Sequence, residues 1–302
     1  MVLDKLPHHD PVKEKPVMAD TPELLLERDA KTGEGPVIDG DLLHWVDIPQ
    51  GLIHRTDLKS LETESLSFEI SIGAAIPIDS VDAYVVAYGN GFGAVENGVI
   101  NPINPFLMDP GYRMNDAKCD ARGRLWGGSC HIKFISGEGK LHRWDGGDSN
   151  KIMVENLALP NGLGWNRENS LMYFVDSVAK RVFVSDFDLA DDFVPQFREL
   201  ITIETGVPDG LAVDNEGCIW LALWGGSRVV RISPQGAIIS EHHFPVSQPS
   251  SCAFGIDGTL YVTSARSNLS ESDLLKQPLA GSLFTLSTNT SGVPVSKFRR
   301  TT

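Results

Sequence analysis

The chain has 302 residues, of which 41% are apolar and 22% are charged, and this length can bury a substantial core. Its formal net charge is −14, which argues against nucleic acid as a partner because phosphate binding needs clustered Lys and Arg. No apolar run approaches the length of a membrane-spanning helix, so we expect no membrane insertion.

The first 22 residues mix charges with Pro and lack the apolar segment of a secretory signal. We interpret residues 1–22 as an N-terminal extension ahead of one domain, residues 23–302. The extension is either unstructured or supplies a strand that closes this domain. A cytoplasmic location is expected, and with it buried thiols rather than disulfides for the four cysteines, which are Cys119, Cys130, Cys218 and Cys252.

Along the rest of the chain, short apolar runs alternate with Gly, Asp and Asn turns, a pattern that indicates β-strands. Six runs carry an aromatic residue, and these lie 39 to 47 residues apart, at Trp45, Tyr84, Trp126, Tyr173, Trp220 and Tyr261. A second strand follows most of them after another turn. This period is typical of β-propeller blades. We therefore predict an all-β, six-bladed β-propeller rather than a β-sandwich, whose strands need no such period.

The repeat also predicts the position of a site, because the innermost strand of each blade lines the central channel and starts at one mouth. Eleven or twelve residues before four of the aromatics stand Glu34, Asn115, Asn161 and Asp209. Two carboxylates that converge on the channel axis repel each other unless a cation lies between them. Such an oxygen-rich set suits a hard divalent cation, whereas the alternative is that these residues only form turns.

Five segments, in this order, resemble the senescence-marker-protein/gluconolactonase/luciferin-regenerating-enzyme family, which includes regucalcin. They are GEGPVIDGDLLHWVDIPQGLIHR, RMNDAKCDARGRLWGGS, LPNGLGWNRENSLMYFVDS, PDGLAVDNEGCIWLALWGGSRVVRISPQG and SSCAFGIDGTLYVTSAR, and they span residues 33–266. The resemblance implies a six-bladed propeller with one divalent metal in its central channel. It also implies hydrolysis of a sugar-acid lactone, the small-molecule partner we expect.

The resemblance implies Glu34, Asn161 and Asp209 as metal ligands, with Ca²⁺ as the first choice and Mg²⁺, Mn²⁺ or Zn²⁺ as alternatives. Asp209 would also accept a proton from the attacking water, as a general base. Arg113 is the implied substrate-binding residue, and Asn115 would bind the substrate or the metal site beside it.

Two further residues are candidates for substrate contact. His131 either contacts the substrate or is structural, and Trp224 either walls the channel mouth or packs within its blade. The run Cys130-His131-Ile132-Lys133 departs from the acidic residues that related sequences often carry there, which leaves the sugar undefined.

Two other functions stay open at this point. The propeller could bind calcium or a partner without catalysis, or it could hydrolyse a non-sugar ester on the same scaffold. The absence of a G-x-S-x-G motif argues against an α/β-hydrolase esterase. The sequence does not define the lactone, the physiological metal or the oligomeric state.

Overall fold

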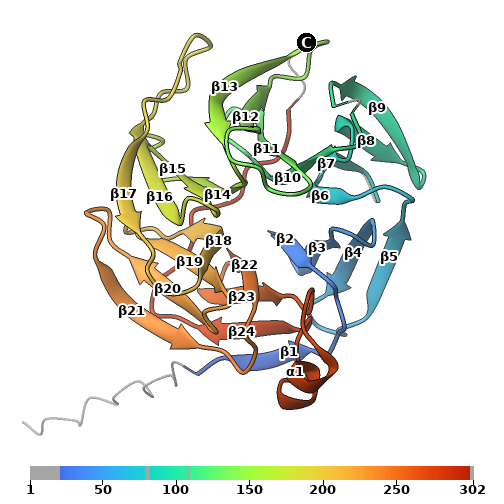
Figure 1. Ribbon diagram of the computed structural model, residues 1–302, viewed down its shortest axis with the longest axis vertical. Helices are drawn as coiled ribbons and strands as arrows, with labels where there is room; N and C mark the ends of the chain where they lie inside the picture. Colours follow the sequence, from blue (N-terminus) through green and yellow to red (C-terminus); the bar gives the residue numbers. More distant parts are fainter. Residues whose placement is uncertain (1–20, 79–81, 108, 300–302) are drawn as a thin grey trace, which may run out of the picture.

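The computed structural model describes residues 21–78, 82–107 and 109–299. Within these residues the strands form six four-stranded antiparallel sheets, which are arranged around a central axis (Figure 1). Five sheets use four strands that are consecutive in the chain, with the first strand nearest the axis. The predicted six-bladed propeller is therefore confirmed, and the β-sandwich alternative is wrong.

The blades are numbered from the first complete sheet. Blade 1 consists of β2 (Gly33–Asp39), β3 (Leu42–Asp47), β4 (Leu52–Asp57) and β5 (Thr63–Ser67); blade 2 of β6 (Ile72–Pro77), β7 (Tyr84–Tyr88), β8 (Gly91–Glu96) and β9 (Val99–Pro105); blade 3 of β10 (Tyr112–Cys119), β11 (Leu125–His131), β12 (Gly139–Trp144) and β13 (Asn150–Leu157); blade 4 of β14 (Pro160–Trp165), β15 (Leu171–Asp176), β16 (Arg181–Asp186) and β17 (Arg198–Thr202); blade 5 of β18 (Val207–Val213), β19 (Ile219–Trp224), β20 (Arg228–Ile232) and β21 (Ile238–His243); and blade 6 of β22 (Pro249–Phe254), β23 (Thr259–Ser264), β24 (Leu283–Ser287) and β1 (Glu23–Leu26).

Blade 6 closes the ring with strands from the two ends of the chain. Its outer strand β1 pairs antiparallel with β24, where Leu24 lies opposite Phe284. This pairing joins the start of the domain to its last repeat, so the ring has no open seam between blades 6 and 1. Residues 1–20 of the expected extension lie outside the described residues.

The predicted aromatic residues all lie on the second strand of their blades, and buried aspartates fix two of them. The carboxylate of Asp120 accepts a hydrogen bond from Nε1 of Trp126 (2.8 Å), and that of Asp214 accepts one from Nε1 of Trp220 (3.0 Å). Asp214 also accepts from Nε of Arg231 at 2.8 Å. Because buried carboxylates need such partners, the turn before the aromatic strand and the strand itself stabilise each other.

The hydrophobic core consists of separate clusters, and neighbouring blades pack against each other through them. Trp126 of blade 3 packs edge-on against Trp165 of blade 4, with ring centroids 6.1 Å apart. Val182 and Val184 of blade 4 join a buried cluster with Leu221 of blade 5. Apolar burial of this kind gives each blade a second sheet to pack on, as layered β-folds require.

The C-terminal segment crosses the propeller at the ends of the inner strands (Figure 1). The N–H of Val293 donates to the carbonyl of Val213 in blade 5 at 2.9 Å. Farther on, Phe298 stacks on Trp144 in blade 3, with ring centroids 4.9 Å apart. This segment covers one end of the channel, and the starts of the inner strands form the other.

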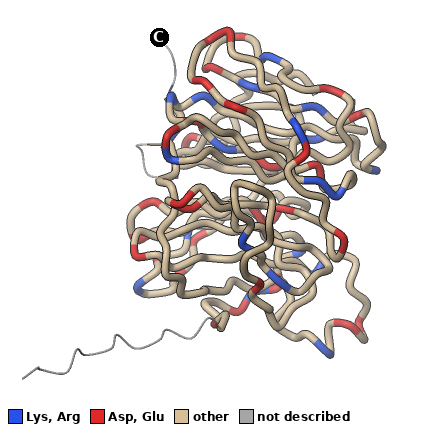
Figure 2. Tube along the Cα trace, turned by 90° about the vertical axis from the view of Figure 1, so that its left-hand side faces the viewer, with Lys and Arg blue, Asp and Glu red and all other residues tan. Residues whose placement is uncertain are grey.

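Two smaller expectations can be compared with the structure. The four cysteines are free and buried, as predicted. The helix α1 (Glu271–Lys276) has six residues, and no helix within the described part of the chain is long and apolar enough to cross a membrane. Lys and Arg are interspersed with Asp and Glu along the trace in Figure 2.

Candidate active site

All six inner strands contain a β-bulge near their start, where the register with the second strand shifts. The shifts fall between Glu34 and Val37, Ile72 and Ala74, Met114 and Ala117, Pro160 and Leu163, Pro208 and Leu211, and Pro249 and Ser251. A bulge bends its strand and re-aims the side chains of the extra residues. The site is therefore built from one repeated backbone irregularity at the mouth of the channel.

Three predicted residues occupy the same place in this irregularity. Asn115, Asn161 and Asp209 are each the first residue after the ladder pair that precedes the bulge of their strand. Glu34 differs, because it still pairs with Val46 and stands one residue earlier. The equivalence of Glu34 with the other three, which counting back from the aromatic residues predicted, is thus wrong by one residue.

The cause of this offset is the first turn of blade 1, in which two residues separate Asp39 from Leu42, whereas five separate Cys119 from Leu125 and Val213 from Ile219. Trp45 stands opposite the bulge itself, whereas Trp126 and Trp220 stand two residues before the residue opposite their bulges. Because the turn is three residues shorter while Trp45 lies two residues later relative to the bulge, counting back eleven residues from Trp45 ends one residue too early. Glu34 nevertheless lines the same cavity as the other candidates.

Glycines let the inner strands approach one another closely. A Cβ atom on Gly162 would lie 2.5 Å from the carbonyl oxygen of Asp209, and one on Gly210 would lie 2.0 Å from Oγ of Ser251. Both distances are shorter than real Cβ contacts, so only glycine fits without moving a blade. The close approach brings the side chains of blades 4 and 5 together at the axis.

A cavity of about 780 Å³ opens over the bulges, within the usual size range of ligand pockets. Six of the seven predicted site residues line it: Glu34, Arg113, Asn115, Asn161, Asp209 and Trp224. His131 is not among the lining residues. Its Nδ1 accepts the N–H of Lys133 at 3.0 Å and its ring meets that of Tyr112 edge-on, so it supports the turn after β11.

Hydrogen bonds hold the polar side chains of this cavity in place. Nη1 of Arg113 donates to Oδ1 of Asn115 at 2.8 Å, and Nδ2 of Asn115 donates to the carbonyl of Pro160 at 2.9 Å. Nδ2 of Asn161 donates to Oγ of Ser177 at 3.1 Å and also to Oδ1 of Asp209. Both amide nitrogens thereby donate to acceptors within the protein.

The carboxylates of the site are buried, which disfavours their charged forms. Burial and the nearby charge of Asp116 raise the pKa of Glu34 to about 8. Burial raises the pKa of Asp209 well above its usual value, and the charges of Glu34 and Asp116 add to the effect. In the absence of a cation, the carboxylates at the channel mouth therefore favour their protonated, neutral forms.

Two residues of the site were not identified from the sequence. Asp116 follows Asn115 in the bulge of blade 3, is buried, and has no hydrogen-bond partner for either carboxylate oxygen among the described residues. The adjacent Asn-Asp pair was a signal that could have indicated it. Ser177, which anchors Asn161, lies in a turn of the same blade and gave no signal in the sequence.

The donor set fits a hard cation. Oδ1 of Asn161 is buried without a hydrogen-bond partner in the described residues, and it adjoins the buried carboxylate of Asp209. In the described chain, no group of three His, Cys, Asp or Glu side chains is placed to hold a metal ion, so an amide oxygen would have to complete the set. Carboxylate and amide oxygens are ligands that Ca²⁺ accepts.

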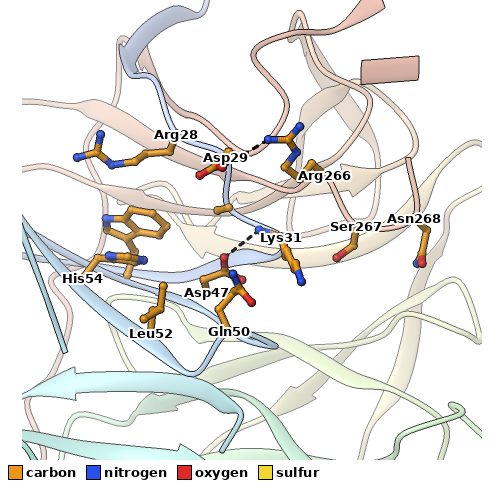
Figure 3. Close-up of a pocket in the computed structure, with 12 residues that line it drawn as sticks. Arg28, Asp29, Lys31, Asp47, Gln50, Leu52, His54, Arg266, Ser267 and Asn268 are labelled. Atoms are coloured by element: carbon orange, nitrogen blue, oxygen red, sulfur yellow. Dashed lines mark hydrogen bonds and ion pairs between the residues drawn. The ribbon is translucent and has the colours of Figure 1, made fainter. Parts of the chain in front are cut away.

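A second pocket of about 570 Å³ lies beside the first, between blades 6 and 1 (Figure 3). Ser267 and Asn268 line both cavities. Two of its contacts are local: Arg266 pairs with Asp29 at 3.8 Å, and the carboxylate of Asp47 accepts the backbone N–H of Lys31 at 2.9 Å. None of the predicted site residues lines this pocket.

The fold and the buried carboxylates and amides define a six-bladed propeller with an oxygen-rich site at one mouth of its channel. The chain belongs to the SMP-30/gluconolactonase/LRE-like family, whose model matches residues 32–266. The resemblance noted in the sequence is thereby confirmed.

Several relatives to which this chain is similar are named as lactonases. L-arabinolactonase of Azospirillum brasilense is 32% identical over 273 residues, which cover 86% of this chain and 88% of that protein. The 6-deoxy-6-sulfogluconolactonase of Pseudomonas putida is 29% identical over 287 residues, 91% of this chain and 97% of that protein. The crystal structure of a calcium-binding protein, regucalcin from Agrobacterium tumefaciens, matches with a TM-score of 0.84 and 26% identity, covering 92% of this chain and 97% of that one.

Proposed function

We propose that this protein hydrolyses the ring ester of a sugar-acid lactone with the help of one divalent cation. The observation that carries the proposal is the buried oxygen set at the channel mouth, in which Glu34, Asn161 and Asp209 line one cavity. The similarity to proteins named as lactonases supports an ester of this kind.

Glu34, Asn161 and Asp209 would hold the cation, which when bound would polarise the lactone carbonyl and make a water molecule more acidic. Two of these side chains are carboxylates whose charged forms burial penalises, and a cation would remove that penalty. Ca²⁺ is the first candidate because the donors are all oxygen, with Mg²⁺, Mn²⁺ and Zn²⁺ as alternatives.

The other residues bind and orient the substrate. Asp209 would accept the proton of the attacking water through the oxygen that Asn161 does not occupy. Nη1 of Arg113 is bound to Asn115 and to the carbonyl of Met114, which leaves its other N–H groups for substrate oxygens. Trp224 offers an aromatic side chain at the rim of the cavity.

The test is proton release from a panel of aldonolactones, using metal-stripped protein to which Ca²⁺, Mg²⁺, Mn²⁺ or Zn²⁺ is added. Asp209→Asn removes the charge and the base while nearly keeping the shape, and Glu168→Gln is the matched control on an exposed turn. We expect metal-restored turnover in the wild type and the control, with a loss of at least about a hundredfold in Asp209→Asn.

Other outcomes would select the alternative functions. Stoichiometric metal binding without turnover of any lactone or ester would indicate a calcium-binding propeller. Turnover of aryl esters alone would indicate an esterase on the same scaffold.

A further inference from the structure

Apolar side chains gather on one side of the active-site cavity. Ile132 and Phe134, in the turn after β11, are 51% and 41% exposed, and Val178, in the turn after β15, is 48% exposed. These three residues and Trp224, at the end of β19, line the same cavity as Glu34 and Asp209. They come from blades 3, 4 and 5, which are successive in the ring, and we call these four residues the apolar wall.

The other exposed large apolar residues of the described chain do not line this cavity. Ile256 lies in the turn between β22 and β23 and Leu275 lies on α1, and neither lines a described cavity with the active-site residues. Single exposed apolar residues are common in soluble proteins and need no function. Several around one cavity are different, because apolar patches of this kind mark ligand-binding grooves.

The turn that carries Ile132 and Phe134 is held in a fixed shape. The N–H of Ile132 donates to the carbonyl of Gly111 and that of Phe134 to the carbonyl of His131, both at 2.8 Å. Phe134 has φ 52°, in the left-handed region that an aromatic residue rarely adopts. Strained backbone of this sort persists where the surrounding structure enforces it, often at ligand sites.

The wall is continuous with the polar floor of the cavity. The guanidinium carbon of Arg113 lies 5.8 Å from the centroid of the Phe134 ring, while Nη1 of the same residue bonds to Asn115. A ligand held by Arg113 would therefore have polar groups on one side and apolar side chains on the other. Among the described residues that line the cavity, Glu34 and Asp209 are the only carboxylates, and the polar residues nearest to Val178 in the chain are Ser177 and Lys180.

We propose that the apolar wall is a specificity subsite for an alkyl or aryl substituent on the lactone ring. This inference rests on the proposed lactonase function and narrows its substrate to lactones with one polar edge and one apolar edge. A simple aldonolactone has about a dozen non-hydrogen atoms, and such a ligand leaves much of the 780 Å³ cavity unfilled. An apolar substituent would fill the part beside the wall.

The test compares two substrate series on the metal-loaded protein: γ-lactones with 4-alkyl chains from methyl to hexyl, and hydroxylated aldonolactones. We expect kcat/KM to rise about fourfold for each of the first few methylene groups, the effect of burying that much apolar surface. Phe134→Asn, alone and combined with Ile132→Ser, should reduce this dependence on chain length by at least half. Asn tolerates the left-handed backbone of position 134, which limits the risk of misfolding.

Ile256→Ser is the matched control, because it replaces an exposed apolar residue outside the cavity and should leave the chain-length dependence unchanged. A wild-type kcat/KM that stays flat or falls with chain length, alongside turnover of aldonolactones, would overturn the subsite and leave the lactonase proposal standing.

A binding measurement keeps the two proposals separate if no lactone is hydrolysed. Alkylated lactams, which resist hydrolysis, can be titrated by calorimetry against the wild type and Phe134→Asn. An affinity that rises with chain length in the wild type, and rises less in Phe134→Asn, would support the apolar wall as a binding subsite even if no lactone is hydrolysed. Affinity that does not depend on chain length would overturn it.

Discussion

Nδ2 of Asn161 donates a hydrogen bond to Oδ1 of Asp209, although the two residues lie 48 positions apart on neighbouring blades. The bond engages the amide nitrogen and leaves Oδ1 of Asn161 buried without a partner among the described residues. An unpaired buried oxygen is costly, so a cation that this oxygen coordinates would stabilise the arrangement.

Cation binding should therefore raise thermal stability. At a free Ca²⁺ concentration one hundred times its Kd, we expect about 2.7 kcal/mol of added stability, seen as a rise of several degrees in Tm. Thermal unfolding of metal-stripped protein with and without Ca²⁺ measures it. Asp209→Asn should lose most of this rise while Glu168→Gln keeps it, and equal rises in both variants would contradict the ligand assignment.

Arg113 should affect substrate binding and not cation binding. Arg113→Lys keeps the positive charge but loses the fork of N–H donors, so we expect kcat/KM to fall roughly tenfold to a hundredfold. The affinity for Ca²⁺, measured by calorimetry, should change less than about threefold, because Arg113 lies outside the proposed ligand set. A large loss of Ca²⁺ affinity would place Arg113 in the cation site instead.

Because packing at the axis is close, replacing Gly210 by a larger residue should reduce the stability of the protein. In Gly210→Ala the new Cβ would lie 2.0 Å from Oγ of Ser251, which forces blades 5 and 6 apart and displaces Asp209. We expect a loss of about 1–3 kcal/mol in the free energy of unfolding. Gly147→Ala is the control, because nothing lies within 4 Å of its Cβ position. Denaturant unfolding of both variants gives the comparison, and similar midpoints would argue against this packing.

The buried network of Asp214 should matter more for stability than surface ion pairs. Asp214→Ala removes the acceptor for Nε1 of Trp220 and Nε of Arg231, at an expected cost of about 3–5 kcal/mol. Asp41→Ala, which breaks an exposed pair with Lys59, should cost less than about 1 kcal/mol. Chemical denaturation measures the free energy of unfolding of both variants. A small effect of Asp214→Ala would show that the turn is stable without this carboxylate.

Stability should decrease in acid because a buried histidine stays neutral. His142 hydrogen-bonds to Oγ of Ser129 (2.8 Å) and to Asn150 (2.7 Å), and burial lowers its pKa to about 3. Between pH 6.5 and pH 3 the unfolded chain binds a proton that the folded protein does not, so stability falls as pH falls. The contribution approaches about 1.4 kcal/mol per pH unit. His142→Gln should reduce the slope of unfolding free energy against pH in this window by nearly one proton, and an unchanged slope would contradict the assignment.

Local patterns in the sequence were sufficient to predict the blades. Each repeat has its own turn, aromatic strand and second strand, and residues such as Asp214 and Trp220 interact within six positions. Contacts this short in sequence need little help from the rest of the fold, which is why the period indicated a propeller. The residue types at Asn115, Asn161 and Asp209 likewise marked the mouth of the channel, because the same bulge recurs at each.

Where the repeats differ, the sequence was less informative. The shorter first turn of blade 1, offset only in part by the position of Trp45, shifted Glu34 by one residue relative to the other candidates. His131 follows Cys130, which pairs with the predicted substrate residue Arg113. Its Nδ1 nevertheless accepts a hydrogen bond from the N–H of Lys133 in its own turn. Pairing register and side-chain direction depend on the partner strand and cannot be counted along one chain.

The sequence by itself determined the six repeats, the all-β class and the kinds of side chain at one end of the inner strands, because each of these depends on neighbours within a few residues. Only the tertiary structure decided that β1 closes the ring, that the carboxylate of Asp116 is buried with no hydrogen-bond partner among the described residues, and that Ile132, Phe134 and Val178 share a cavity with Asp209. These features depend on contacts between separate blades, and closure of the ring sets those contacts. Burial then determines which oxygens are free to bind a ligand.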